Sequence, residues 1–273
     1  MEDVRAARCA TVDPAAVYQR TRLAMAATVA ELADDELQAL VPATPEWRVR
    51  DVLAHVVGLA ADLNAQRFPA ADDAGGSAWA AQQVVARRDL AVAAIVAEWV
   101  REAPVFEAGL RFFGYEEGSH FVADLHAHHQ DVRGALGLSR DDDPLTVAVA
   151  LDHYLGFLDQ LLLAAQWGTL EVVAGNEARL VGGAGVPRAG VSGSAFDVLR
   201  SFSAAFGSAD PRTRVARRRR RSARTAAAGL HRWLLVAGGR PDRVAAIAAG
   251  GALMVVRSLI RAATTGGGAV SAH

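Results

Sequence analysis

Apolar residues recur three and four positions apart along most of the first 167 residues, the period of an amphipathic α-helix. The first helix is predicted over AAVYQRTRLAMAATVAEL, where Asp13 can cap the helix and Pro14 suits its first position. The same period continues in EWRVRDVLAHVVGLAADLNAQ, in a long stretch from about Ala78 that Pro104 interrupts or partly ends, in SHFVADLHAHHQDVRGAL and in TVAVALDHYLGFLDQLLLAAQW. Long helices joined by short connections predict a helix bundle over residues 12–167.

The pattern changes after Gly168. LEVVAG and ARLVGG are short, contain β-branched residues and are bounded by Gly and Asn, which predicts two strands. SAFDVLRSFS predicts a helix after them. Residues 168–203 are therefore expected to begin a small α+β domain, and the fold class is mostly α.

Composition indicates a soluble globular protein, since 52 % of the residues are apolar and 22 % are charged. Cys9 is the single cysteine, so no internal disulfide is expected. The first residues show no apolar run of signal-peptide length, and no stretch of about 20 apolar residues suits a membrane span. We therefore expect a cytoplasmic enzyme or binding protein without a membrane partner.

The charge is divided unevenly along the chain. All 29 basic side chains are Arg; 16 of them stand with 28 acidic residues before residue 204, whereas 13 stand with only two acidic residues from Ala204 onward. The second part includes five consecutive arginines, Arg217–Arg221. Such a run is typical of a phosphate-binding arm, but no interleaved aromatic residues or binding fold accompany it.

Three residues are candidates for a divalent-metal site: His55, Asp124 and His128. Asp124 and His128 are four positions apart in a predicted helix, so their side chains share one face. His55 lies on another predicted helix and can project into the same bundle interior. Two imidazoles and one carboxylate would leave coordination positions open, as in catalytic metal sites. The alternative is a histidine hydrogen-bonded within the core, because this spacing also arises by chance.

The other histidines receive different interpretations. His126 and His129 should point away from the face of Asp124 and His128, as surface or rim residues. His120 lies on that face one turn upstream. His153 could line the cavity, but a packed core histidine is the preferred interpretation.

WRVRDVLAHVVGLAADL and DLHAHHQDVRGALG resemble two motifs of the mycothiol-dependent maleylpyruvate isomerase N-terminal domain family, within the DinB-like superfamily of metalloenzymes. The resemblance covers roughly residues 14–203 and implies a DinB-like four-helix bundle. It places the family's metal ligands on His55, Asp124 and His128, although the characterised isomerase type has Glu at the position of Asp124. Asp131 matches a second acid of the motif; it could hydrogen-bond a ligand histidine or pair with Arg133.

The resemblance implies a metal-dependent enzyme that uses a low-molecular-weight thiol, mycothiol or a similar compound, with zinc as the expected ion. The metal would activate the thiol for attack on an electrophilic small molecule, by isomerisation or S-transfer. Two alternatives remain open: a non-catalytic metal-binding or small-molecule-binding protein, and a nucleic-acid-binding protein that uses the Arg run. The sequence does not indicate an oligomeric state.

Residues 204–273 depart from the family. After a helix such as DVLRSFS, the family continues with a segment like GRRSAAQIRALxW. Codons for Ala204–Arg212, read one base later with suitable wobble bases, can encode RRSAAQIRA. We therefore interpret 204–273 as an aberrant tail from a frameshift near Ser203, and expect it to pack poorly on residues 169–203.

Overall fold

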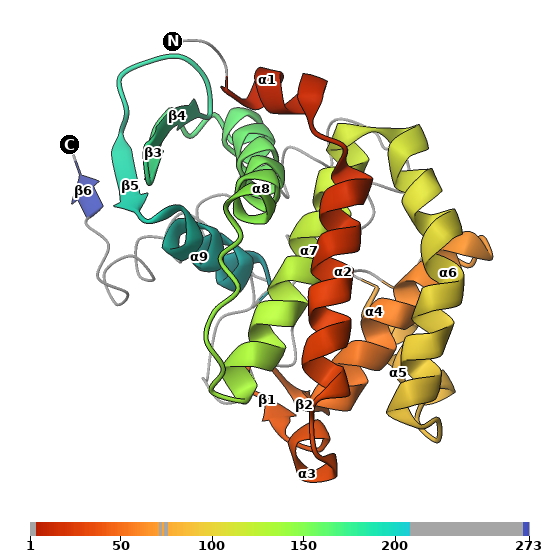
Figure 1. The fold of residues 1–273 in the computed structure, drawn as a ribbon. Coiled ribbons are helices and arrows are strands. Elements are labelled where there is room, and N and C mark those ends of the chain that lie inside the picture. Colours follow the sequence, from red (N-terminus) through yellow and green to blue (C-terminus); the bar gives the residue numbers. More distant parts are fainter. Residues whose placement is uncertain (1–3, 71–72, 74–75, 208–269, 273) are drawn as a thin grey trace. The chain divides into compact units, whose positions relative to one another are not determined.

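A computed structural model describes residues 4–70, 73, 76–207 and 270–272 of the chain. The chain divides into two compact units, Met1–Asp152 and His153–His273. Helices predominate among the described residues, and a small sheet follows them (Figure 1). This confirms the mostly α fold class predicted from the sequence. The domain boundary expected near residue 168 stays a prediction.

Four long helices form the bundle of the first unit: α2 (Pro14–Ala30), α4 (Val49–Asn64), α6 (Val92–Phe113) and α7 (Tyr115–Ala135). Helix α2 packs against α6 and α7, and α4 packs against the same two helices (Figure 1). Asp13 caps α2, because its carboxylate accepts a hydrogen bond from the amide of Ala15. The interior is apolar and includes Met25, Leu53, Val57, Ile95, Trp99 and Leu125.

Short elements connect these helices, and the sequence pattern predicted few of them. Helix α1 (Val4–Thr11) precedes the bundle, and α3 (Asp34–Leu37) leads into a hairpin of β1 (Leu40–Val41) and β2 (Thr44–Arg48). The sequence indicated only a break here, because the apolar period of so short a hairpin is not visible. Helix α5 (Ser77–Ala86) packs along α4.

Two expectations about the segment from Ala78 need correction. It is not one long stretch, because residues 87–91 separate α5 from α6. Pro104 does not end a helix but lies inside α6. Proline cannot donate to the carbonyl four residues before it, that of Val100. Both Pro104 and Val100 lie on the exposed face of α6, where water can satisfy that carbonyl.

Helix α8 (Pro144–Ala164) begins in the first unit. Asp152 is fully buried in it, accepts two hydrogen bonds from Arg8 of α1 at 2.8 and 3.0 Å, and accepts one from the Tyr115 hydroxyl at 2.7 Å. Contrary to the expectation from sequence, α8 is long and apolar enough to cross a membrane by length and composition alone, and 44 % of its apolar stretch is buried. Core helices of soluble proteins can have the same length and composition, so these properties are weak evidence for a membrane span.

The second unit contains a four-stranded sheet in the order β4-β3-β5-β6. The predicted strands are present as β3 (Leu170–Ala174) and β4 (Glu177–Val181), which pair as an antiparallel hairpin. Strand β5 (Ala189–Gly193) runs parallel to β3, and α9 (Ala195–Gly207) contacts both. The sequence analysis missed β5, because its glycines obscure a strand pattern.

The structure describes two short parts of residues 204–273, namely 204–207 and 270–272. Strand β6 (Val270–Ala272) pairs antiparallel with β5 at the edge of the sheet, with Ala189 opposite Ala272. The expectation that residues 204–273 pack poorly on residues 169–203 stays a prediction, because most of this segment is not described. Residues 208–269 and 273, which include the Arg run, lie outside the described part of the chain.

Candidate metal centre

The three candidate ligands lie on two helices of the bundle. His55 comes from the middle of α4, and Asp124 and His128 are one turn apart on α7. Helix α4 buries the apolar neighbours of His55, such as Val52 and Val56, so the position of the ring follows from the core packing of its helix. The close packing of α4 against α7 then brings the three side chains together.

The geometry of the cluster suits one ion. One potential ligand atom from each of the three residues lies within 4.8 Å of the other two. Nε2 of His128 is 3.7 Å from Oδ1 of Asp124. Ligands bound at about 2.0–2.2 Å to a tetrahedral ion lie about 3.3–3.6 Å apart, so this pair already has nearly that separation.

The surroundings of His128 also suit a ligand. Its Nδ1 is buried and has no hydrogen-bond partner among the described residues. The side chain is 16 % exposed and that of Asp124 is 28 % exposed, so the cluster lies in a partly open part of the bundle. No contact of the described residues fixes the tautomer of His128, so Nε2, the nitrogen 3.7 Å from Asp124, can keep the lone pair that an ion requires.

His55 is held from two sides. Its Nδ1 lies 2.8 Å from Oε1 of Gln83, a buried residue of α5. The Trp47 ring of β2 packs on the imidazole with ring centroids 5.0 Å apart, and the His128 ring lies at the same distance, nearly perpendicular to it. Trp47 thus forms one wall of the site.

The sequence analysis missed Gln83 and its partner Asp62. A signal was present, because His55, Gly58 and Asp62 follow one another at three and four positions and so share one face of α4. Nothing in the pattern indicated which helix would cover that face.

Asp124 also adjoins a neutral phenol. Burial raises the pKa of Tyr18 well above its ordinary value, and the negative charge of Asp124 raises it further. Tyr18 on α2 therefore stays protonated at neutral pH. On the same helix, Arg22 forms a buried ion pair with Glu107 of α6 at 3.0 Å.

The expectation that His126 and His129 are surface or rim residues is wrong. They point away from the face of Asp124 and His128, but they are only 2 % and 0 % exposed. Nε2 of His129 lies 3.1 Å from Oγ1 of Thr28 on α2, and its Nδ1 lies 3.4 Å from a carboxylate oxygen of Asp141. Helical spacing gives the direction of both side chains correctly, but it does not show that α2 and the 138–143 loop cover that side of α7.

The buried cluster around His129 is polar and well connected. Burial lowers the pKa of His129 from its ordinary 6.5 to about 4, although the charge of Asp141 opposes this shift. Gln130 donates to the main-chain oxygen of Asp141 at 2.6 Å, and Nε2 of His126 lies 3.3 Å from the same oxygen. These contacts fix the 138–143 loop on α7, so we interpret both histidines as structural.

The remaining candidates lie outside the cluster. His120 is half-buried against the Phe121 ring, and His153 is half-buried beside Tyr154. Asp131 does not hydrogen-bond Nδ1 of His128, since that atom has no partner among the described residues. Arg133 donates to the Ser139 main chain and to Thr28.

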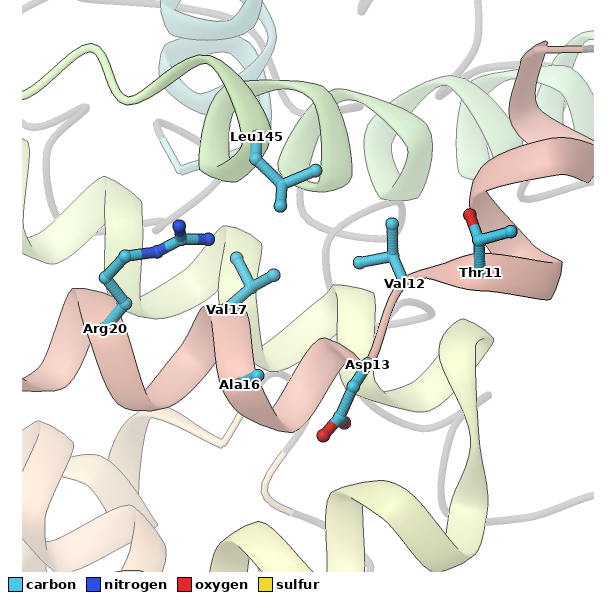
Figure 2. A pocket seen from close by; sticks show the side chains of 7 residues that line it. All are labelled: Thr11, Val12, Asp13, Ala16, Val17, Arg20 and Leu145. Atoms are coloured by element: carbon cyan, nitrogen blue, oxygen red, sulfur yellow. The ribbon is translucent and has the colours of Figure 1, made fainter.

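A separate hollow lies on the surface between the start of α2 and the start of α8 (Figure 2). The side chains of Val12, Val17 and Leu145 give it an apolar wall. Its charged residues already have partners, since Arg20 lies 3.8 Å from Asp143 and Asp13 pairs with Arg111 at 2.8 Å. We therefore assign no ligand to it.

Fold and site together define a class: helix-bundle proteins with two imidazoles and one carboxylate converging between two core helices. Residues 18–124 match the family described as the mycothiol maleylpyruvate isomerase N-terminal domain. The family resemblance predicted from the sequence is thereby confirmed for this part of the chain. The match includes His55 and ends at Asp124, so His128 lies one helical turn beyond it. No curated protein and no solved structure matches the chain.

Proposed function

We propose that this protein is a metal-dependent enzyme that uses a low-molecular-weight thiol, mycothiol or a close analogue, to attack an electrophilic small molecule. The observation that supports this most directly is the cluster of His55, Asp124 and His128 within 4.8 Å. The family match over residues 18–124 supports the thiol, because the family is described by its mycothiol maleylpyruvate isomerase. A cytoplasmic location, where such thiols are kept reduced, belongs to the same proposal.

The donor set favours zinc among the divalent ions. Two neutral imidazoles and one carboxylate are the ligands of catalytic zinc sites, which keep at least one position open. A bound divalent ion would lower the pKa of a thiol placed at that position, so that thiolate forms at neutral pH. Asp124 and His128 are partly exposed, so a thiol and its electrophile would reach the ion from that side.

The roles of the residues follow from their chemistry. His55 and His128 would bind through neutral rings, and Asp124 would contribute the negative charge. Its side chain is one methylene shorter than that of the usual Glu, so it would require a closer approach of α7 to the ion. The protein needs no nucleophile of its own, and Cys9 lies on α1 near Glu116.

Zinc titration of the full chain tests the metal site. The wild type should bind close to one ion, and His128→Ala should lose most of the bound zinc, because it removes one of three ligands. His120→Ala is the matched control, since it removes a half-buried imidazole from the same helix one turn from Asp124, and it should keep the ion. Failure of the wild type to bind zinc, or equal loss in both variants, would overturn the assignment.

The thiol is tested with the zinc-loaded protein, mycothiol and a maleylpyruvate-type electrophile. Isomerised product or an S-conjugate, formed by the wild type and His120→Ala but not by His128→Ala, supports the proposal. Stoichiometric zinc without any reaction of the thiol would instead support a non-catalytic metal-binding protein. The nucleic-acid alternative rests on Arg217–Arg221, which lie outside the described residues.

A further inference from the structure

Gln83 is a buried polar side chain that contacts a candidate ligand directly. It is 1 % exposed, and its Oε1 lies 2.8 Å from Nδ1 of His55. A buried amide that hydrogen-bonds one ring nitrogen determines whether the other nitrogen carries a proton or a lone pair. This follows because a neutral imidazole has one N–H and one lone pair.

The direction of this hydrogen bond is fixed by the next residue in the chain of contacts. Nε2 of Gln83 donates to Oδ2 of Asp62 at 3.1 Å. An ionised carboxylate only accepts, so the amide must turn its NH₂ group toward Asp62 and its oxygen toward His55. Arg67 pairs with the other carboxylate oxygen, Oδ1, at 2.7 Å.

The consequence for His55 is a single tautomer. An amide oxygen accepts but cannot donate, so Nδ1 of His55 carries the proton, and Nε2 keeps the lone pair that a metal requires. Hydrogen bonds of this kind to ligand histidines typically fix both tautomer and ring orientation in metal sites.

The backbone holds Gln83 against α4. A Cβ atom added at Gly58, one turn beyond His55, would lie 2.5 Å from Cβ of Gln83. Only glycine permits this approach of α5. Arg87, the residue that follows the end of α5, donates to the main-chain oxygen of Gln83 at 3.1 Å and pairs with Glu98 of α6 at 2.6 Å.

We propose that Gln83 is a positioning residue of the metal centre, which holds His55 as the Nδ1–H tautomer with Nε2 available to the ion, and that Asp62 sets the orientation of its amide. The metal part of this inference rests on the function proposed above. The tautomer itself does not, because it can be measured in the metal-free protein.

The first measurement is therefore ¹⁵N NMR of His55 in the metal-free protein at a pH where the ring is neutral. The wild type should show a protonated Nδ1 and an unprotonated Nε2. Gln83→Leu removes the acceptor, so a substantial Nε2–H population should appear. Gln82→Leu is the matched control, because Gln82 is the exposed neighbour on the same helix, and its spectrum should equal that of the wild type.

The second measurement is the zinc dissociation constant by competition with a chelator. Loss of such a supporting hydrogen bond typically weakens metal binding by about 10–100-fold, so we expect this for Gln83→Leu and no change for Gln82→Leu. The double variant Gln83→Glu with Asp62→Asn exchanges donor and acceptor between these two residues. It keeps an acceptor for His55 and should restore both the tautomer and the affinity.

The outcomes separate the two proposals. An unchanged tautomer in Gln83→Leu overturns the role of Gln83, even when zinc binds as in the wild type. A wild type that binds no zinc overturns the proposed function, while the tautomer measurement still decides the role of Gln83. Should Gln83→Leu fail to fold, the double variant decides alone: an Nδ1–H tautomer supports the proposal, and an Nε2–H tautomer overturns it.

Discussion

Replacing Gly58 with Ala tests the close contact between α4 and α5. The new Cβ would lie 2.5 Å from Cβ and 2.8 Å from Cγ of Gln83, and 2.8 Å from Nη1 of Arg87. Carbon atoms pack at about 3.5–4.0 Å, so α5 would have to move by roughly 1 Å. The nearest atom is Cβ of Gln83, which no side-chain rotation can move, so the backbone of α5 itself must shift.

The expected cost follows from two opposing effects. Overpacking of a well-packed contact costs about 1–3 kcal/mol. Alanine inside a helix regains roughly 0.5–1 kcal/mol relative to glycine. The free energy of unfolding should therefore fall by about 1–2 kcal/mol, measurable as a lower urea midpoint at an unchanged slope.

Gly109→Ala on α6 is the matched control, because a Cβ added there meets no atom within 4 Å. It should be neutral or stabilising by up to about 1 kcal/mol, through helix propensity alone. If Gly58→Ala were as stable as Gly109→Ala, α5 would not be fixed on α4 as described, and the position of Gln83 would lose its support.

Two further changes concern buried ionisable groups. Because the folded state holds His129 neutral, with its pKa lowered from 6.5 to about 4, the unfolded chain binds the proton more readily within that range. The contribution of neutral His129 to the free energy of unfolding is complete above pH 6.5 and decreases by roughly 3 kcal/mol as the pH falls toward 4. Between pH 6.5 and 4, the urea midpoint of His129→Gln should therefore depend less on pH than that of the wild type. An equal pH dependence of the two midpoints would contradict the assignment. Asp152→Ala leaves Arg8 and Tyr115 without their buried acceptor and should lower the free energy of unfolding by about 3–5 kcal/mol. Asp142→Ala breaks an exposed ion pair and should lower it by less than about 1 kcal/mol. Similar urea midpoints for the two variants would refute this reasoning.

The sequence predicted those parts of the fold that local chemistry determines. The cap at Asp13, the apolar period of the long helices and the change of pattern after Gly168 reappear in the structure. The three candidate ligands were found because helical spacing and the family motif placed them, and the structure brings them together. That they bind a metal stays a prediction.

The parts that could not be predicted depend on contacts between distant segments. The burial of His129 requires Thr28 and Asp141, and the orientation of His55 requires Gln83, 28 positions away. A helix pattern shows which side chains share a face, but the element that covers each face is decided by tertiary packing. Strand β6 also depends on a contact between distant segments, because three residues that pair with β5 through the main chain carry no recognisable strand pattern.

Helix α7 presents adjacent histidines to two different surroundings, since one residue corresponds to about 100° around the helix axis. His128 lies with the candidate ligands, whereas His129 is fixed to α2 and to the 138–143 loop. The contacts of His129 therefore set the rotational phase of the helix, and with it the angle at which Asp124 and His128 approach an ion. A few degrees of rotation, caused by a substitution in the 138–143 loop, would alter the coordination angles without changing any ligand. Under the proposed function, selection on metal affinity would thus act through a loop that holds none of the candidate ligands.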